Sequence, residues 1–219
     1  MPPHVYGEFC HSLQNPLCVI QSCLEIVEKT LPTESRSLCQ MMRESIADIS
    51  TRIQDFLTYT SIQPIEQVDT SELFSLSSYL LEILEYVDIT ALESDVLLIS
   101  HIAVGVMFFG NKTHIGEMVT NLLSNAITHT KDSRYRDITV VLKESCVGTC
   151  LLIRDTGTGI TKKDLPHVFE RYYSSNVEKG HGLGLSIVKQ IVERYGGLIS
   201  ITSPPGYGTF VSIRFPRTQ

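Results

Sequence analysis

The chain has 219 residues, of which 42% are hydrophobic and 19% are charged, and its formal net charge is -6. This composition is normal for a globular protein of one or two domains, and the acidic balance argues against a nucleic-acid partner. No apolar run approaches the roughly 18 residues of a membrane-spanning helix, so we expect no membrane insertion and a cytoplasmic location. The six cysteines form no CxxC pair, and we expect them to be reduced thiols.

The first sixty residues carry two heptad patterns. Apolar residues recur every three or four positions over Phe9–Leu31 and again over Cys39–Phe56, with Pro32 between the two runs. This spacing predicts two helices with long apolar seams, ending at Gln63-Pro64. A four-helix bundle of two hairpins buries such seams well, so we predict a homodimer through residues 5–62. The alternative is a hairpin that packs onto the following domain.

His11 lies off the first apolar seam and is therefore predicted to face solvent. Pro16, five residues later, removes a backbone hydrogen bond inside the same helix and should bend it. From the helix pattern alone, an ordinary surface histidine beside a tolerated bend is the simpler interpretation.

The remaining residues predict helices and strands that interleave without the regular alternation of a parallel α/β fold. We therefore expect an α+β chain with a helical hairpin over 1–63 and a domain over 64–219 in which helices cover one face of a mixed sheet. The predicted helices are Ser71–Val87, 111–126 and Leu183–Tyr195, and the predicted strands are Asp95–His101, Val104–Phe109, Asp137–Glu144, Thr149–Arg154, Leu198–Thr202 and Thr209–Phe215.

Some polar residues in these elements, or at their ends, have side chains that could bind a ligand. Asn121 and Asn125 are four apart, so both amides project from one helix face, where their oxygens suit Mg²⁺. Asp155 follows an apolar strand and precedes two glycines, so it could accept a hydrogen bond from the exocyclic amine of adenine. Taken singly, the pair could equally be surface amides, and Asp155 could equally be a turn residue.

A glycine-rich stretch precedes the last predicted helix. Glycines allow a backbone to approach a ligand closely, and the N-terminus of the helix offers free N–H groups to a phosphate. Gly180, Gly182 and Gly184 are therefore candidate phosphate-binding residues, although such a loop alone is a weak signal.

Six motifs occur in one order along nearly the whole chain, and together they resemble the sensor histidine kinases of two-component signalling. The motifs are His11–Leu17, Asn121–Ala126, Asp155–Ile160, Phe169–Tyr173, Gly180–Leu185 and Gly206–Thr209.

The resemblance implies a dimerising phosphotransfer hairpin followed by a Bergerat-type (GHKL) ATP-binding α/β sandwich. It implies that His11 accepts the γ-phosphoryl group of ATP, that Asn125 holds Mg²⁺ and that the phosphoryl group passes to an aspartate on a response-regulator receiver domain. By matching position or neighbouring charge, the residues expected to bind ATP are Asn121, Asn125, Asp155, Gly157, Gly159, Lys179, Gly180, Gly182, Leu183, Gly184 and Thr209.

Two positions depart from the family pattern. Ser12 stands where an acidic residue commonly follows the phospho-acceptor, and Thr128 stands where a lysine often contacts phosphate. Serine is a poor base, so we expect slow phosphoryl transfer, with Lys179 or Lys131 as possible sources of the missing charge. Asn15 matches a position that can orient water for dephosphorylating the regulator.

Two other functions compete with the kinase. Ser12 and Thr128 favour a phosphotransfer or scaffold dimer that binds ATP but relays phosphate from another kinase. A GHKL ATPase of the gyrase or chaperone type would need a glutamate at the position of Asn121, where an amide cannot act as a base.

Overall fold

The computed structural model describes residues 20, 24, 39–43, 45–46, 49, 71–131, 133–173 and 182–217. The chain divides into two compact units, Met1–Gln67 and Val68–Gln219. In the first unit, residues 39–43 are helical, and Leu24, Cys39 and Ile46 form a small buried cluster. The predicted hairpin bundle, its homodimer and the site residues His11, Ser12, Asn15, Lys179 and Gly180 lie outside the described residues and stay predictions.

In its described residues, the second unit contains strands, helices and a short 3₁₀ turn in mixed order. In chain order they are β1 (Glu72–Ser75), α3 (Leu76–Glu93), β2 (Leu97–Ile102), β3 (Met107–Gly110), α4 (Lys112–Thr130), β4 (Asp137–Ser145), β5 (Gly148–Asp155), η2 (Leu165–His167), α5 (Gly184–Arg194), β6 (Leu198–Thr202) and β7 (Phe210–Pro216).

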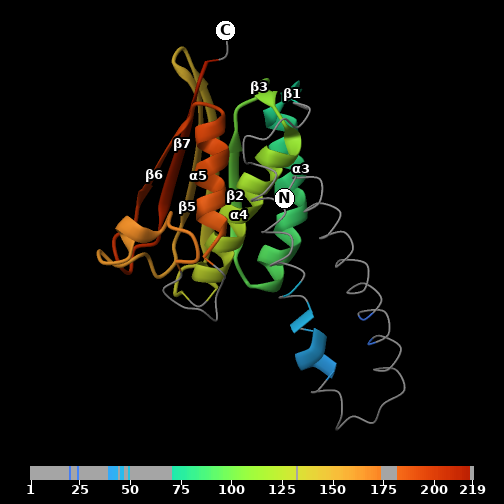
Figure 1. Cartoon of the computed structure of the whole chain (residues 1–219), viewed down its shortest axis with the longest axis vertical. Coiled ribbons are helices and arrows are strands. Elements are labelled where there is room, and N and C mark those ends of the chain that lie inside the picture. The colour runs from blue at the N-terminus through green and yellow to red at the C-terminus, as the bar shows by residue number, and fades with distance from the viewer. Residues whose placement is uncertain are drawn as a thin grey trace, which may run out of the picture. The chain divides into compact units, whose positions relative to one another are not determined.

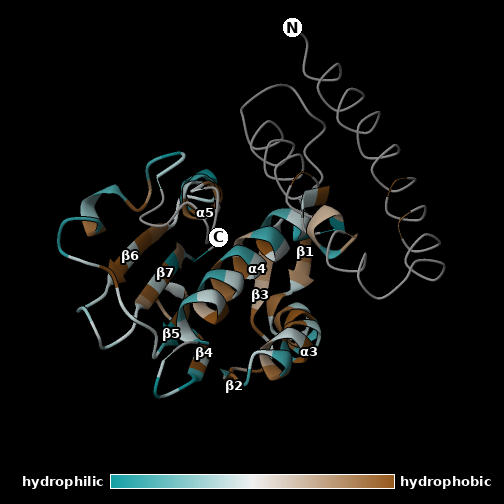
Figure 2. Ribbon diagram, turned by 90° about the horizontal axis from the view of Figure 1, so that it is seen from below, coloured by the Kyte–Doolittle hydropathy of each residue, from teal (hydrophilic) through white to brown (hydrophobic). Residues whose placement is uncertain are grey.

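Five of the strands form one mixed sheet in the order β2-β4-β5-β7-β6. β2 runs parallel to β4, and the other neighbours are antiparallel. Helices α5, α4 and α3 pack against one face of this sheet, and α4 lies between α5 and α3 (Figures 1 and 2). The predicted α/β sandwich is confirmed for this unit.

Alternating side chains of the sheet form the core. Ile138 and Val140 of β4 and Ile153 of β5 are buried on the inner face under α4, and Ile187 and Ile191 form part of the buried face of α5. The period of two along each strand and of nearly four along the helix produces this match. The core therefore fixes the ends of β5 and α5, which carry the candidate site.

The caps of α4 and α5 follow the sequence signals. The Asn111 side-chain oxygen accepts a hydrogen bond from the Thr113 N–H at 2.7 Å and so caps α4. At the end of α5, Gly196 takes φ +64° and Gly197 N–H bonds to the Val192 carbonyl oxygen at 2.8 Å. This is a Schellman arrangement, which a glycine after the helix favours.

The predicted helix from Ser71 is wrong in its first turn. Residues 72–75 form β1, and α3 begins only at Leu76, with the Ser75 hydroxyl accepting from Ser78 N–H at 3.2 Å. β1 pairs antiparallel with β3, with Leu73 opposite Phe109. A partner strand about 35 residues away supplies backbone hydrogen bonds that a helix pattern cannot reveal.

Among the described residues, no helix is long and apolar enough to cross a membrane. The described cysteines, Cys39, Cys146 and Cys150, are free thiols.

Candidate functional site

Asp155 is the last residue of β5 and is 6% exposed. Its Oδ1 accepts two backbone hydrogen bonds, from Gly157 N–H at 2.8 Å and from Thr209 N–H at 3.0 Å. Both bonds go to the same oxygen, so the carboxylate is fixed in orientation and Oδ2 can accept a hydrogen bond from a ligand.

The environment of Asp155 disfavours the ionised form. Burial raises the pKa of the Asp155 carboxyl above its ordinary value of 3.8, against the hydrogen bonds from Gly157 and Thr209 and the nearby His129, which lower it. A carboxyl group whose pKa is raised by burial, at the end of a strand, is a candidate for ligand recognition.

The loop between β6 and β7 is joined to the loop after Asp155 by one buried hydroxyl. Ser203 Oγ accepts from Ile160 N–H at 2.8 Å, donates to the Gly208 carbonyl oxygen at 3.0 Å and lies 3.0 Å from Thr209 Oγ1. Sequence reasoning missed Ser203. Its signal was a serine directly after a strand and before Pro204-Pro205, a position that favours side-chain bonding to the backbone.

The glycines near Asp155 are enclosed by backbone. Gly208 has φ +83°, and a Cβ there would overlap the Asp155 carbonyl oxygen. Gly159 has φ +72°, and a Cβ there would lie 2.5 Å from the Pro204 carbonyl oxygen. Gly157 packs in the same way against the His129 carbonyl oxygen. These contacts leave no room for side chains, so this part of the site has a shape set by the main chain. We call Asp155, Gly157, Gly159, Ser203, Gly208 and Thr209 the carboxylate end of the site.

A second group of predicted residues meets where α4 passes the start of α5. A Cβ on Gly184 would lie 2.8 Å from Asn121 Oδ1 and 3.7 Å from Asn125 Nδ2. Asn121 Nδ2 donates to the Glu117 carbonyl oxygen at 3.0 Å, which turns Oδ1 of the same amide toward α5. Gly184 is thus small because two amides occupy the space beside it. We call Asn121, Asn125 and Gly184 the helix end.

The helix end has the donors and acceptors that a metal–phosphate group needs. The first turn of α5 carries free backbone N–H groups that favour an anion, and amide oxygens are hard ligands for Mg²⁺. In the described part of the chain, no group of three or more His, Cys, Asp or Glu could hold a metal by itself. The residues therefore fit a Mg²⁺ ion that also takes oxygens from a bound phosphate.

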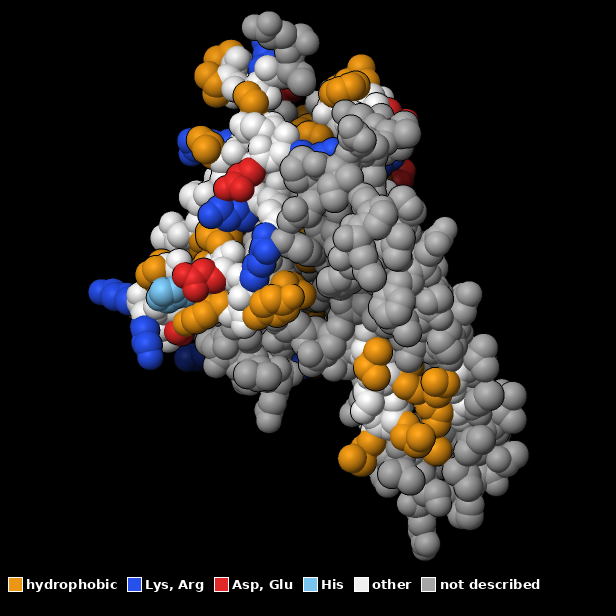
Figure 3. Space-filling view, in the orientation of Figure 1, with side chains coloured by type: hydrophobic (Ala, Val, Ile, Leu, Met, Phe, Trp, Pro, Cys, Tyr) orange, Lys and Arg blue, Asp and Glu red, His pale blue; other side chains and the backbone are white. Residues whose placement is uncertain are grey.

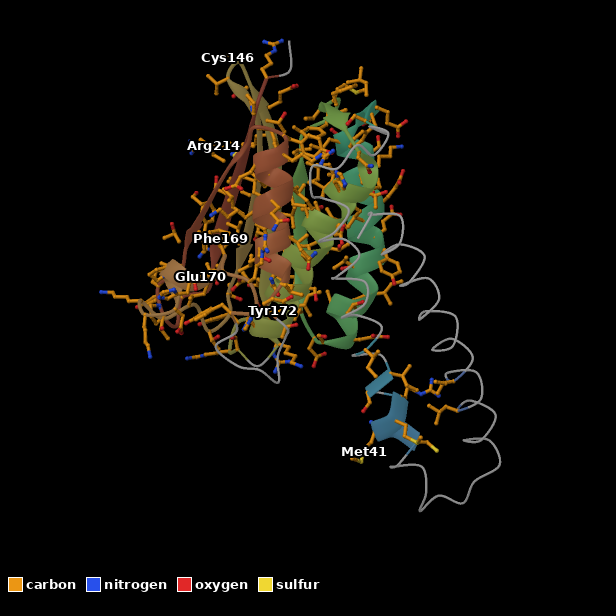
Figure 4. The ribbon with its side chains drawn as sticks, viewed as in Figure 1. Met41, Cys146, Phe169, Glu170, Tyr172 and Arg214 are labelled. Carbon is orange, nitrogen blue, oxygen red and sulfur yellow. The ribbon has the colours of Figure 1, made fainter. Side chains whose placement is uncertain are left out.

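A backbone hydrogen bond joins the residues on the two sides of the segment 174–181, beside the helix end. Tyr172 N–H donates to the Gly182 carbonyl oxygen at 2.9 Å, and Leu183 is buried. The Tyr173 hydroxyl donates to Asp164 Oδ1 at 2.7 Å. Phe169, Glu170 and Tyr172 lie on the side of the unit where α5 begins (Figure 4).

Thr128 occupies a half-buried position on α4, between the two ends of the site, and exposed His129 follows it. The helix therefore presents no lysine there to a phosphate.

Comparison with known proteins identifies this arrangement. Residues 110–219 match the family described as histidine kinase-, DNA gyrase B-, and HSP90-like ATPase, and this range contains both ends of the site. The chain belongs to this family. The predicted resemblance to sensor histidine kinases is confirmed, and the second unit is a GHKL-type ATP-binding catalytic domain of that class.

Relatives extend the similarity along the chain. The sensor histidine kinase YclK of Bacillus subtilis is 29% identical over 97% of this chain and 46% of its own length. The sensor histidine kinase Hik2 of Synechocystis is 30% identical over 91% of this chain and 54% of its own length. The chain thus spans about half the length of these relatives.

Two solved structures share the fold. Full-length ShkA in complex with AMPPNP aligns over 99% of this chain with a TM-score of 0.78 at 19% identity, covering 46% of that chain. The mycobacterial sensor histidine kinase MprB aligns over 67% of this chain and 97% of its own, with a TM-score of 0.58 and 29% identity.

Proposed function

We propose that the chain is the core of a histidine protein kinase in which His11 takes the γ-phosphoryl group of ATP and passes it to an aspartate of a response regulator. The observation that carries this proposal is the fixed, buried Asp155 carboxylate in one domain with the Asn121–Asn125–Gly184 cluster. The similarity to sensor histidine kinases over 97% of the chain includes the segment with His11.

The carboxylate end is the place for adenine. Asp155 Oδ2 accepts from the exocyclic amine, and Gly157 and Gly159 shape the pocket for the ring. Thr209 supports the carboxylate through its backbone N–H. Guanine carries an oxygen where adenine carries this amine, so a carboxylate would repel it. This end therefore selects ATP over GTP.

The helix end is the place for the phosphates. Asn125, assisted by Asn121, would hold Mg²⁺, which supplies charge neutralisation to the phosphate oxygens. The first turn of α5, which begins at Gly184 beside Asn121, offers backbone N–H groups to the phosphates, and Leu183, Gly180, Gly182 and Lys179 complete the proposed phosphate-binding set. A solved relative of the same fold was obtained with the ATP analogue AMPPNP, which supports the assignment of the nucleotide class.

The proposed transfer needs little covalent machinery from the protein. A nitrogen of neutral His11 attacks the γ-phosphorus, the bond from that phosphorus to the bridging oxygen breaks, ADP leaves with the electron pair and the imidazole loses its proton. Ser12 is a poor acceptor for this proton, so the step is slow. We assign to Asn15 the orientation of a water molecule that dephosphorylates the regulator. We assign the homodimer contact to residues 5–62.

Ser12 and Thr128 favour a second candidate, an ATP-binding relay dimer that receives phosphate from another kinase. One assay separates the two. With Mg²⁺ and γ-labelled ATP, the kinase acquires an acid-labile, base-stable label that His11→Gln abolishes and His101→Gln, on an exposed strand residue, leaves unchanged. Measurable ATP binding without any label would reject the kinase and support the relay.

The account of Ser12 has its own test in the same assay. Ser12→Glu restores an acidic group beside His11 and should speed labelling, by about tenfold or more, since positioned general bases contribute at least this much. A labelling rate that stays flat or falls would show that Ser12 does not limit the transfer.

A further inference from the structure

Helix α3 presents an outer face that is both acidic and apolar. The helix contains four acidic residues, Glu82, Glu85, Asp88 and Glu93, and no basic one. Large apolar side chains are exposed beside them, namely Leu81, Tyr86, Ile89 and Leu92, with Ile89 60% exposed and Leu92 65% exposed. In the described part of the chain, none of the four acids has an ion pair.

The C-terminal turn of α3 adds a local charge repulsion to this face while the face is uncovered. Glu93 lies in the last turn, where the helix dipole favours a cation, and that turn holds no basic residue. A positively charged surface docked against α3 would therefore remove a local repulsion as well as cover apolar side chains.

The outer face of the five-stranded sheet has the opposite charge. Lys143 of β4, Arg154 of β5 and Arg214 of β7 all point away from the helix layer and are exposed, although the chain is acidic overall. Arg214 marks this side in Figure 4, and Figure 3 shows Lys and Arg side chains, with hydrophobic and some acidic ones among them, on the side of the unit where the sheet lies. No ion pair joins these three bases to any acid among the described residues.

The two faces match in spacing. On α3, Glu85, Ile89 and Glu93 follow one another at intervals of four residues, about 6 Å each at 1.5 Å per residue. On β5, Cys150, Leu152 and Arg154 lie on the outer face about 6.6 Å apart, at twice the rise of about 3.3 Å per residue. Arg214 is paired with Cys150 across the strands, so the sheet offers base, leucine, base over the length on which α3 offers acid, isoleucine, acid.

We infer that the outer sheet face of one chain binds the α3 face of a second copy of the same chain. The occupant is a second copy because the chain itself carries both halves of the charge pattern, on opposite outer sides of one sandwich (Figure 1). Such a contact joins two different surfaces and does not close on itself, so it generates a series of larger assemblies. It is separate from the dimer proposed for residues 5–62 and does not depend on the kinase reaction.

Sedimentation velocity on the full chain tests the inference through charge reversal. At about 0.05 M salt the wild type should form a series of assemblies larger than the dimer as protein concentration rises, and we call this series the ladder. Raising the salt to about 0.5 M should dissociate these assemblies, because exposed ion pairs are screened. Arg154→Glu/Arg214→Glu and Glu85→Lys/Glu93→Lys should each abolish the ladder.

An equimolar mixture of the two variants should restore association, since one then has two negative faces and the other two positive faces. Lys162→Glu/Lys163→Glu makes the same change in net charge as Arg154→Glu/Arg214→Glu, at exposed positions off both faces, and should keep the ladder. A wild type that never exceeds the dimer would overturn the inference. So would a ladder that survives in both charge-reversed variants, or a mixture that stays dissociated.

Discussion

The carboxylate end and the helix end of the site are held in different ways. At the carboxylate end, Asp155 is fixed by backbone N–H groups, and Gly208 and Gly159 touch backbone carbonyl oxygens. At the helix end, a Cβ on Gly184 would meet the side-chain amides of Asn121 and Asn125. A clash with the backbone can be relieved only by moving the main chain, whereas a side-chain amide can rotate away. Substitutions of the glycines at the first end should therefore cost stability, and substitution of Gly184 at the second should cost binding.

The largest effect is expected at Gly208, with Gly206 as its match. Both glycines have nearly the same backbone angle, φ +83° and +81°, but only a Cβ on Gly208 meets another atom, the Asp155 carbonyl oxygen. Gly206→Ala should cost about 1 kcal/mol of unfolding free energy for the positive φ alone. Gly208→Ala should cost on the order of 3 kcal/mol or more, because the overlap adds to the same strain. Equal urea midpoints for the two variants would contradict the rigid carboxylate end.

A smaller loss of stability is expected at Tyr195, where the other end of α5 meets α4. The Tyr195 hydroxyl accepts from Asn111 N–H at 3.0 Å and bonds His114 Nδ1 at 2.9 Å. Tyr195→Phe removes both hydrogen bonds and should cost about 1–3 kcal/mol. ATP affinity should not change, since the site lies at the opposite end of the helix. A parallel loss of ATP binding in calorimetry would mean that the two ends of α5 are coupled.

Gly184→Ala should show the reverse behaviour. A methyl group 2.8 Å from Asn121 Oδ1 forces that amide to turn away, while alanine suits a helix better than glycine. Mg·ATP affinity should fall about tenfold, which is about 1.4 kcal/mol, with the melting temperature unchanged or raised. Gln190→Ala, later on the same helix, is the control that should leave affinity intact. If Gly184→Ala destabilises the fold instead, the helix end is as rigid as the other end.

The smallest effect concerns the dependence of stability on pH. The pKa of Asp155 is raised in the folded state, so the folded protein binds this proton more tightly than the unfolded chain. Its stabilising contribution is present below the ordinary pKa of 3.8 and is lost as pH rises through the folded value. Asp155→Asn removes this loss, so the variant should gain stability relative to wild type as pH increases from about 4 to about 7. If the melting temperature of Asp155→Asn falls relative to that of the wild type over this pH range, the raised pKa is contradicted.

The difference between the ends also explains what the sequence could predict. Local signals worked where the cause is local. β6 occupies Leu198–Thr202 as predicted, and Asn111 and Gly196 cap α4 and α5. The motif order indicated Asp155, Asn121 and Gly184. The sequence could not show that Gly184 is small because of Asn121, since that contact spans more than 60 residues.

Residues that act through long-range backbone bonds escaped prediction for the same reason. Ser203 joins two loops that only the sheet brings together, and β1 exists because β3 pairs with it. Neither has a periodicity of its own to reveal it.

The central claim is that the fixed Asp155 carboxylate recognises adenine, and calorimetric titration of ATP and GTP into wild type and Asp155→Asn tests it most directly. The wild type should bind ATP and reject GTP. The variant should keep its fold but lose at least about tenfold in ATP affinity, because a hydrogen bond to a charged acceptor contributes about 1.5–3 kcal/mol. A folded variant that binds ATP as tightly as wild type, or a wild type that binds GTP equally well, would contradict the account.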